Sequence, residues 1–216
     1  MKNSEIRSKQ AENILYAAKR LFAQQGYHGT NTKEIARLAD IAENTLFRYF
    51  ERKEELFWAV LRSTLSGFEL RLDLLALVAQ GAGPEEVLPK LVTQLIDLTI
   101  LRPDLLRLIA IALIELPWKA SAVLHEYLSP TISAVNEYVS KSIESGKLRK
   151  LDSSLVTTAI IATVIGYPSL SGLLSATAQP YSDRREAIRA YSKFWIEILA
   201  PPGVDLFRTA QDFESH

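Results

Sequence analysis

The chain has 216 residues, of which 48% are hydrophobic, so it can bury a substantial core and is not a disordered chain. Its basic and acidic residues are equal in number, and it has no cysteine, which excludes disulfides, thiolate metal sites and a cysteine nucleophile. His28, His125 and His216 lie far apart, without the spacing of metal ligands. We therefore predict neither a metal site nor a cofactor.

The N-terminal residues MKNSEIRSKQAEN contain no apolar core of the kind that a secretory signal needs. We expect a cytoplasmic protein. The stretch from Ser153 to Ser182 has no charged residue, but Ser, Thr, Gly and Pro recur throughout it. We therefore predict a helix buried between protein surfaces there, and no membrane partner.

Apolar residues recur at helical spacing from Ile14 to Phe22, which predicts an amphipathic helix over about Ser4–Gln25 that Gly26 ends. A short second helix follows, because the Asn31 side chain can cap it. A third is predicted over Glu43–Tyr49. The residues between the two short helices leave room only for a tight turn, so these helices must cross steeply. That geometry is typical of a helix-turn-helix, whose second helix enters a DNA major groove.

The charge distribution along the chain agrees with this interpretation. Residues 1–62 contain 11 Lys and Arg against 8 Asp and Glu, whereas residues 63–216 contain 14 against 17. The basic part therefore coincides with the predicted helix-turn-helix, and its positive net charge favours contact with phosphates.

The remainder of the chain also has helical periodicity. Apolar residues spaced by three and four predict one long helix from Lys53 to about Val78. A shift of this helix would be transmitted to the helix-turn-helix. Pro and Gly residues then separate further helices, predicted at about Pro84–Leu101, Pro103–Glu115, Lys119–Ser145, Asp152–Ala176 and Ser182–Leu199. The stretch from Leu105 to Ile114 is apolar almost all the way round, so we expect it to be the most buried helix of the C-terminal part. No run has the alternation of a strand, and we predict an all-α fold.

The N-terminal part contains several short motifs, namely Gly26-Tyr27, Ile35-Ala36, Ala39, Thr45-Leu46 and Tyr49-Phe50 followed by Lys53-Glu54-Glu55-Leu56. Together they resemble the TetR family of bacterial transcriptional regulators. The resemblance covers about the first 60 residues, and beyond them only the helical layout is similar. It implies a homodimer with one helix-turn-helix per subunit and a C-terminal domain that dimerises and holds a small-molecule effector.

Three residues depart from the family pattern. They bear on which operator sequence is bound rather than on the fold. Ala42 stands where the family usually has a capping Ser, Asn44 where a small residue is usual, and Phe47 where Tyr is frequent. The resulting expectation is a helix-turn-helix domain of three helices over residues 1–52, a larger helical effector-binding and dimerisation domain over residues 53–200, and a tail over residues 201–216.

The candidate DNA-binding residues have side chains that suit phosphates or base edges. They are Thr32, Lys33, Glu43, Asn44, Thr45, Arg48, Tyr49 and Lys53. Asn44 can pair with adenine and Arg48 with guanine, and Glu43 can accept from cytosine. Lys53 opens the long helix, where its ammonium and the free backbone N–H groups can meet a phosphate. For Tyr49, donation to a phosphate and simple packing both stay open.

Candidate effector contacts are polar residues among apolar ones in the C-terminal part, namely Gln94, Thr99, His125, Tyr127 and Tyr138. Such a pocket suits a largely apolar effector with a few polar anchors. The dimer interface is predicted on the last two helices, where a broad apolar face contains Ile188, Tyr191, Phe194, Trp195 and Ile198.

The predicted function is a repressor that binds a palindromic, double-stranded DNA operator as a homodimer and is released by a small effector. The alternative is a DNA-binding regulator without a small ligand, which a protein partner controls or which acts constitutively. An enzyme is not expected, because the sequence has no HExxH, no ExxH pair, no GxSxG and no Gly-rich phosphate loop.

Overall fold

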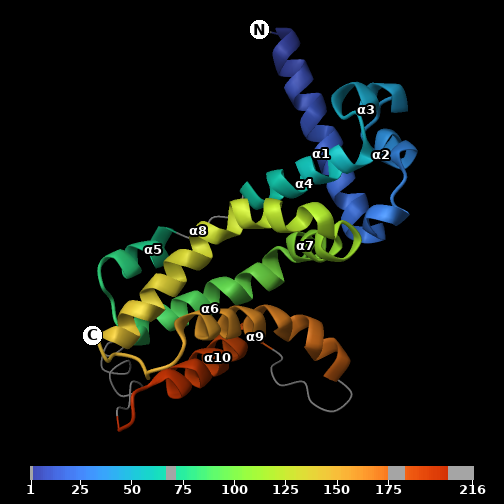
Figure 1. Cartoon of the computed structure of the whole chain (residues 1–216). Coiled ribbons are helices and arrows are strands. Elements are labelled where there is room, and N and C mark those ends of the chain that lie inside the picture. Colours follow the sequence, from blue (N-terminus) through green and yellow to red (C-terminus); the bar gives the residue numbers. More distant parts are fainter. Residues whose placement is uncertain (1, 67–71, 175–182, 204–216) are drawn as a thin grey trace. The chain divides into compact units, whose positions relative to one another are not determined.

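The computed structural model describes residues 2–66, 72–174 and 183–203, and these are helical with no strand (Figure 1). An all-α fold is therefore confirmed. The helices are α1 (Lys2–Gly29), α2 (Thr32–Leu38), α3 (Glu43–Tyr49), α4 (Lys53–Ser66), α5 (Leu72–Ala79), α6 (Pro84–Leu101), α7 (Pro103–Glu115), α8 (Pro117–Glu144), α9 (Ser153–Leu174) and α10 (Arg184–Leu199).

The chain forms two compact units that do not follow one another simply along the sequence. The first unit contains α1 to α4, α7 and α8 up to Leu128, and the second contains α5, α6, α8 from Ser129, α9 and α10. Helix α8 therefore belongs to both units. The predicted domain boundaries at residues 52 and 200 stay predictions, and most of the predicted tail lies outside the described residues.

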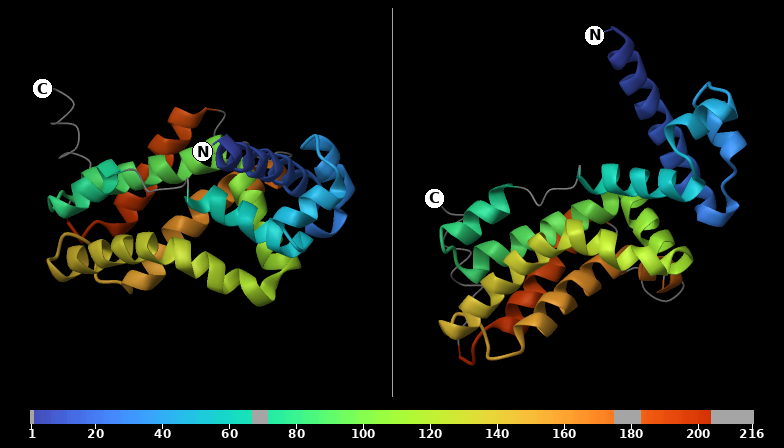
Figure 2. Two further views of the ribbon diagram at one scale, coloured as in Figure 1. Left: turned by 90° about the horizontal axis from the view of Figure 1, so that it is seen from above. Right: turned by 45° about the horizontal axis from the view of Figure 1, so that its top comes forward.

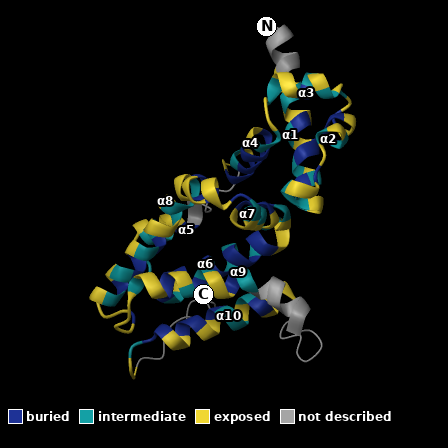
Figure 3. Cartoon of the chain, turned by 45° about the vertical axis from the view of Figure 1, so that its right-hand side comes forward, coloured by how far each residue is buried: buried dark blue, intermediate teal, exposed yellow. Residues whose placement is uncertain are grey.

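The core of the first unit is built around aromatic side chains where α1 packs against α4. The Phe22 and Phe57 rings meet edge to face with centroids 5.1 Å apart, and the Trp58 ring meets Phe57 at 5.3 Å. All three side chains are buried. Figure 3 accordingly shows α4 largely in the colour of buried residues. Helix α2 packs against α1, which forms part of this core, and α3 packs against α2.

The core of the second unit is organised around α6, which packs against α5, α9 and α10. In Figure 2, α6, α9 and α10 run side by side in this unit. The buried apolar residues of α6 recur at three- and four-residue spacing from Val87 to Ile96, as expected for a helix covered on more than one side. Side chains from α8, α9 and α10, including Val139, Ile160 and Trp195, complete this core.

The structure bears on two expectations about the middle of the chain. Where one helix from Lys53 to Val78 was predicted, the structure has α4 and α5, and residues 67–71 between them lie outside the described residues. The expectation that Leu105–Ile114 is the most buried helix of the C-terminal part is wrong. This segment is α7 of the first unit, it packs on α1 and α4, and Ile114 is 78% exposed. A run of apolar residues does not identify the neighbours that cover it, and α6 occupies the central place.

Candidate DNA-binding site

The helix-turn-helix consists of α2, a tight turn and α3, and its first helix begins as the sequence predicts. Asn31 is the N-cap residue of α2, and its Oδ1 accepts a 2.9 Å hydrogen bond from the Lys33 backbone N–H. Ile35 and Ala36 bury the inner face of α2, and Leu46 does the same for α3. The two short helices are therefore held by a few buried apolar side chains and, at the start of α2, by the Asn31 cap.

The turn between them is closed by a Schellman pair of backbone hydrogen bonds. The Ile41 N–H donates to the Ala36 carbonyl at 3.0 Å, and the Asp40 N–H donates to the Arg37 carbonyl at 3.2 Å. Asp40 occupies the left-handed position of this motif with a φ of 55°, where glycine is usual. Asp is one of the few other residues that tolerate this conformation. The turn is thus fixed by its backbone bonds despite lacking the customary glycine.

The second helix lacks a side-chain cap, but its first residue is bonded to the start of α2. Ala42 is the N-cap residue of α3 and makes no side-chain capping bond, as the departure from the family pattern predicts. Instead, the Thr32 hydroxyl donates a 2.7 Å hydrogen bond to the Glu43 Oε1. This bond joins the first residues of α2 and α3. Two predicted DNA contacts, Thr32 and Glu43, therefore bind each other.

The outer face of α3 presents the side chains proposed to read bases. Asn44 and Arg48 are exposed, one turn apart, and neither side chain has a hydrogen-bonding partner within the described part of the chain. Thr45 between them is half-buried. Phe47 is 40% exposed, so an apolar ring lies on the same surface. Such a face can contact base edges and the thymine methyl group.

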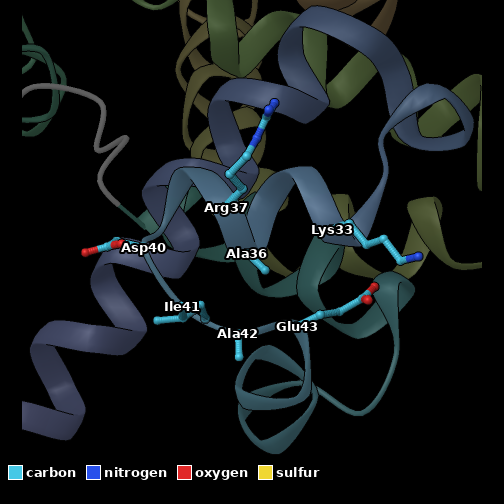
Figure 4. A pocket seen from close by; sticks show the side chains of 7 residues that line it. All are labelled: Lys33, Ala36, Arg37, Asp40, Ile41, Ala42 and Glu43. Carbon is cyan, nitrogen blue, oxygen red and sulfur yellow. The ribbon is translucent and has the colours of Figure 1, made fainter.

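An open hollow of about 530 Å³ lies beside the turn (Figure 4). Its lining combines two basic, two acidic and three apolar side chains, namely Lys33, Arg37, Asp40, Glu43, Ala36, Ile41 and Ala42. In Figure 4, the Lys33 and Glu43 side chains extend toward the same side, and Asp40 points away from them. Sequence reasoning missed Arg37, an exposed basic residue in the last turn of α2. Its position next to the turn would have been the signal.

Lys53 has an extensive structural role in addition to the predicted phosphate contact. Its Nζ donates hydrogen bonds to the carbonyls of Tyr27 at 2.9 Å and Thr30 at 3.0 Å. The same ammonium lies 4.5 Å from the centroid of the Tyr27 ring. Burial and the neighbouring Glu54 carboxylate raise the pKa of Tyr27. Lys53 therefore fastens the segment before α2 to the start of α4.

Tyr49 joins α3 to α1 because its hydroxyl donates a 3.0 Å hydrogen bond to Gln10 Oε1. Gln10 was not singled out from the sequence, since nothing local connects it to a residue 39 positions away. The geometry supports packing for Tyr49, and its donation to a phosphate stays a prediction.

Comparison with known proteins supports the same site. The sequence model described as "Bacterial regulatory proteins, tetR family" matches residues 14–60, which contain the helix-turn-helix and the start of α4. The chain belongs to the TetR family. Members of this family are transcriptional regulators that bind DNA through a helix-turn-helix, and neither the family nor the relatives found are enzymes.

Two relatives and one solved structure illustrate how far the similarity extends. The chain is 25% identical to the transcriptional regulator RutR of Escherichia coli K12 over 93% of this chain and 95% of RutR. It is 32% identical to the transcriptional repressor NicS of Pseudomonas putida, over about half of each protein (49% and 50%). The TetR fold also matches FadR of Bacillus subtilis in complex with stearoyl-CoA, with a TM-score of 0.62, 20% identity, and coverage of 90% of this chain and 99% of FadR.

The predicted effector contacts of this TetR-family chain are divided between the two units. Gln94, Thr99 and Tyr138 lie in the second unit, whereas His125 and Tyr127 lie in the first. The Thr99 hydroxyl donates to the Ile96 carbonyl at 2.7 Å, and the Tyr138 hydroxyl donates to the Ala82 carbonyl at 3.1 Å. Burial raises the pKa of Tyr138 to about 12. His125 is exposed. Neither unit contains all five predicted effector contacts.

The five predicted dimer-interface residues of α10 differ in burial. Trp195 is only 6% exposed and belongs to the core of the second unit, and Ile188 and Tyr191 pack against that core. Phe194 and Ile198 are 49% and 37% exposed. The apolar periodicity of α10 thus combines an inner face with an outer one, and only the outer face is accessible to a second subunit.

Metal and membrane sites were not expected from the sequence. Among the residues with described positions, no group of His, Asp and Glu is arranged to hold a metal ion. No helix in the described ranges is long and apolar enough to cross a membrane.

Proposed function

We propose that this TetR-family regulator is a repressor that binds a palindromic operator as a homodimer and is released from it by a small, largely apolar effector. The observation that carries the proposal is the outer face of α3, where Asn44 and Arg48 are exposed on a helix fixed at its start by the Thr32–Glu43 bond. Amide and guanidinium groups in this position suit adenine and guanine edges. NicS is named a transcriptional repressor, which supports repression rather than activation.

The homodimer is supported by the way in which dimeric helix-turn-helix proteins read DNA. One recognition helix of seven residues contacts only a few base pairs, so specific binding needs two half-sites about 34–36 Å apart. The exposed apolar residues Phe194 and Ile198 of α10 and Leu155 of α9 supply a surface for the second subunit. Leu155 is 69% exposed, and the exposed part of α9 around it carries no charge.

An effector is supported by the chemistry of the relatives. FadR, which shares the fold, has been solved with stearoyl-CoA, a ligand with a long apolar chain and a polar head. Acyl-CoA thioesters are therefore the first probes to test here. The contacts proposed from the sequence in the second unit, Gln94, Thr99 and Tyr138, are the polar groups that we propose to anchor such a ligand.

The test uses a duplex that the protein itself selects from a random-sequence library. Stearoyl-CoA and a short-chain acyl-CoA are then titrated into the protein with and without that duplex. By linkage, an effector that weakens operator binding must be bound more weakly in the presence of operator by the same factor, typically 1–3 kcal/mol of coupling. Equal affinities in both titrations, for both thioesters, would exclude them as inducers. A regulator that needs no small ligand would then be favoured.

A further inference from the structure

Helix α7 is fastened to α1 at both of its ends within the first unit. Near its beginning, the Asp104 carboxylate forms an ion pair with the Lys19 ammonium. At its last residue, the Glu115 Oε2 accepts a 2.8 Å hydrogen bond from the backbone N–H of His28. His28 lies just beyond Gly26, where the helical backbone of α1 is interrupted. The Glu115 carboxylate therefore binds the segment that leads from α1 to α2.

The position of this carboxylate depends on a glycine. Gly26 has a φ of 77°, and a Cβ atom at this position would lie only 2.7 Å from the Glu115 Oε1. A side chain at residue 26 would therefore strain the backbone and would also meet the carboxylate. Gly26 permits both the break in α1 and the close approach of Glu115.

The same segment is held by two other side chains. The Thr30 hydroxyl donates a 2.6 Å hydrogen bond to the Gly26 carbonyl, and the Lys53 ammonium donates to the carbonyls of Tyr27 and Thr30. Lys53 thus satisfies carbonyl acceptors of this segment, whereas Glu115 satisfies an N–H donor. The next residue, Asn31, caps α2. The start of the helix-turn-helix is therefore fixed from α4 and from α7 by charges of opposite sign.

The position of Glu115 at the end of α7 is unfavourable for a negative charge. A carboxylate in the last turn of a helix is repelled by the partial negative charge of the free carbonyl groups there. Bonding to the His28 N–H compensates for this repulsion. Replacement of Glu115 is accordingly expected to loosen the segment between α1 and α2 without weakening α7 itself.

We propose that Glu115 is a positioning residue for operator binding: its carboxylate holds the Gly26–Thr30 segment in the conformation that orients α2 and α3. The proposal rests on the DNA-binding function and assigns to it a side chain that lies outside the helix-turn-helix. In the sequence, α7 and the first part of α8 are flanked on both sides by segments of the second unit. The chain therefore passes between the two units at Arg102–Pro103 and within α8.

The experiment compares Glu115→Ala with Glu115→Gln and with Glu126→Ala. Glu126 is an exposed acidic residue of α8 in the same unit, so its replacement removes the same charge without affecting the Gly26–Thr30 segment. Each variant is titrated with the selected operator duplex and with a random-sequence duplex, using fluorescence anisotropy and protein whose active fraction is known. Amide hydrogen exchange of residues 26–30 is measured on the same samples.

We expect Glu115→Ala to lower operator affinity by about tenfold relative to Glu126→Ala, with a much smaller change for random DNA, because phosphate contacts tolerate a less well oriented α3. The Gln variant keeps an acceptor oxygen and is expected to recover most of the loss. Exchange of the His28 amide is expected to accelerate in the Ala variant.

Equal operator affinities for Glu115→Ala and Glu126→Ala would overturn the positioning role, as would a loss shared equally by operator and random DNA. A wild-type protein that selects no duplex from the library would instead contradict the DNA-binding function itself, before any variant is compared.

Discussion

The Lys53 ammonium lies over the Tyr27 ring and donates a hydrogen bond to the Tyr27 carbonyl. Lys53→Ala removes this contact and the bond to the Thr30 carbonyl. We expect it to lower the free energy of unfolding by about 2 kcal/mol, since hydrogen bonds from charged donors are strong. Urea denaturation measures this loss.

The phosphate contact predicted for Lys53 has a separate signature. If it exists, Lys53→Ala also reduces the slope of log K against log salt concentration by about one, for every duplex. Lys33→Ala is the matched control, because Lys33 is exposed and its side chain makes no ion pair within the described residues. It is expected to change the slope but not the stability. An unchanged slope for Lys53→Ala would leave Lys53 with a structural role alone.

Substitutions of Asp40 test whether the turn needs its left-handed backbone conformation. The Asp40 φ of 55° suits glycine better than any residue with a Cβ. We expect Asp40→Gly to be more stable than Asp40→Ala by about 1 kcal/mol, because a left-handed conformation costs Ala roughly that amount. Thermal unfolding of both variants measures the difference. Equal melting temperatures would mean that the turn relaxes out of this conformation.

Base reading is tested at Arg48, which is exposed on α3. Arg48→Ala is expected to weaken the selected operator by about 1–3 kcal/mol and random DNA much less, since a bidentate contact to guanine is specific. Arg52→Ala serves as a control, because Arg52 is exposed beyond the end of α3. The same loss for operator and random DNA in Arg48→Ala would identify a phosphate contact instead.

The dimer interface is tested on the outer face of α10. Phe194→Glu combined with Ile198→Glu places two charges on exposed positions and is expected to yield folded monomers in sedimentation velocity. Trp195→Ala differs in kind. It removes a buried ring and is expected to cost about 3–5 kcal/mol of stability in the subunit itself. A double Glu variant that remains dimeric would exclude this face.

Tyr138 gives the second unit a specific response to high pH. Burial keeps its pKa at about 12, against 10.0 for an exposed tyrosine. The unfolded chain therefore loses this proton first as the pH rises, and stability falls between pH 10 and about 12. Tyr138→Phe is expected to lose this part of the pH dependence, together with about 1 kcal/mol for the bond to the Ala82 carbonyl. Urea denaturation at several pH values compares the two proteins, and parallel profiles would contradict the shift.

The sequence predicts the helices well because their ends have local causes. Asn31, Pro84 and Pro103 determine where α2, α6 and α7 begin, and these starts agree with the structure. The recognition helix was also located correctly at Glu43–Tyr49. Such signals act over three or four residues, so they can be recognised without knowledge of the tertiary structure.

What the sequence could not predict depends on contacts between distant residues. The bonds of Lys53 to the Tyr27 and Thr30 carbonyls span 26 and 23 positions, and the bond of Glu115 to His28 spans 87. Trp195 has the same helical spacing as residues on the outer face of α10, yet it points into the core. Periodicity identifies a stripe of apolar residues, but the partner that covers the stripe is determined by the whole fold.

Helix α8 is a single helix of 28 residues that changes unit between Leu128 and Ser129, and Pro130 follows directly. Proline has no N–H, so the Glu126 carbonyl lacks its usual partner within the helix. A helix that lacks one backbone hydrogen bond bends more easily at that point, so we expect α8 to bend most readily close to the junction between the units.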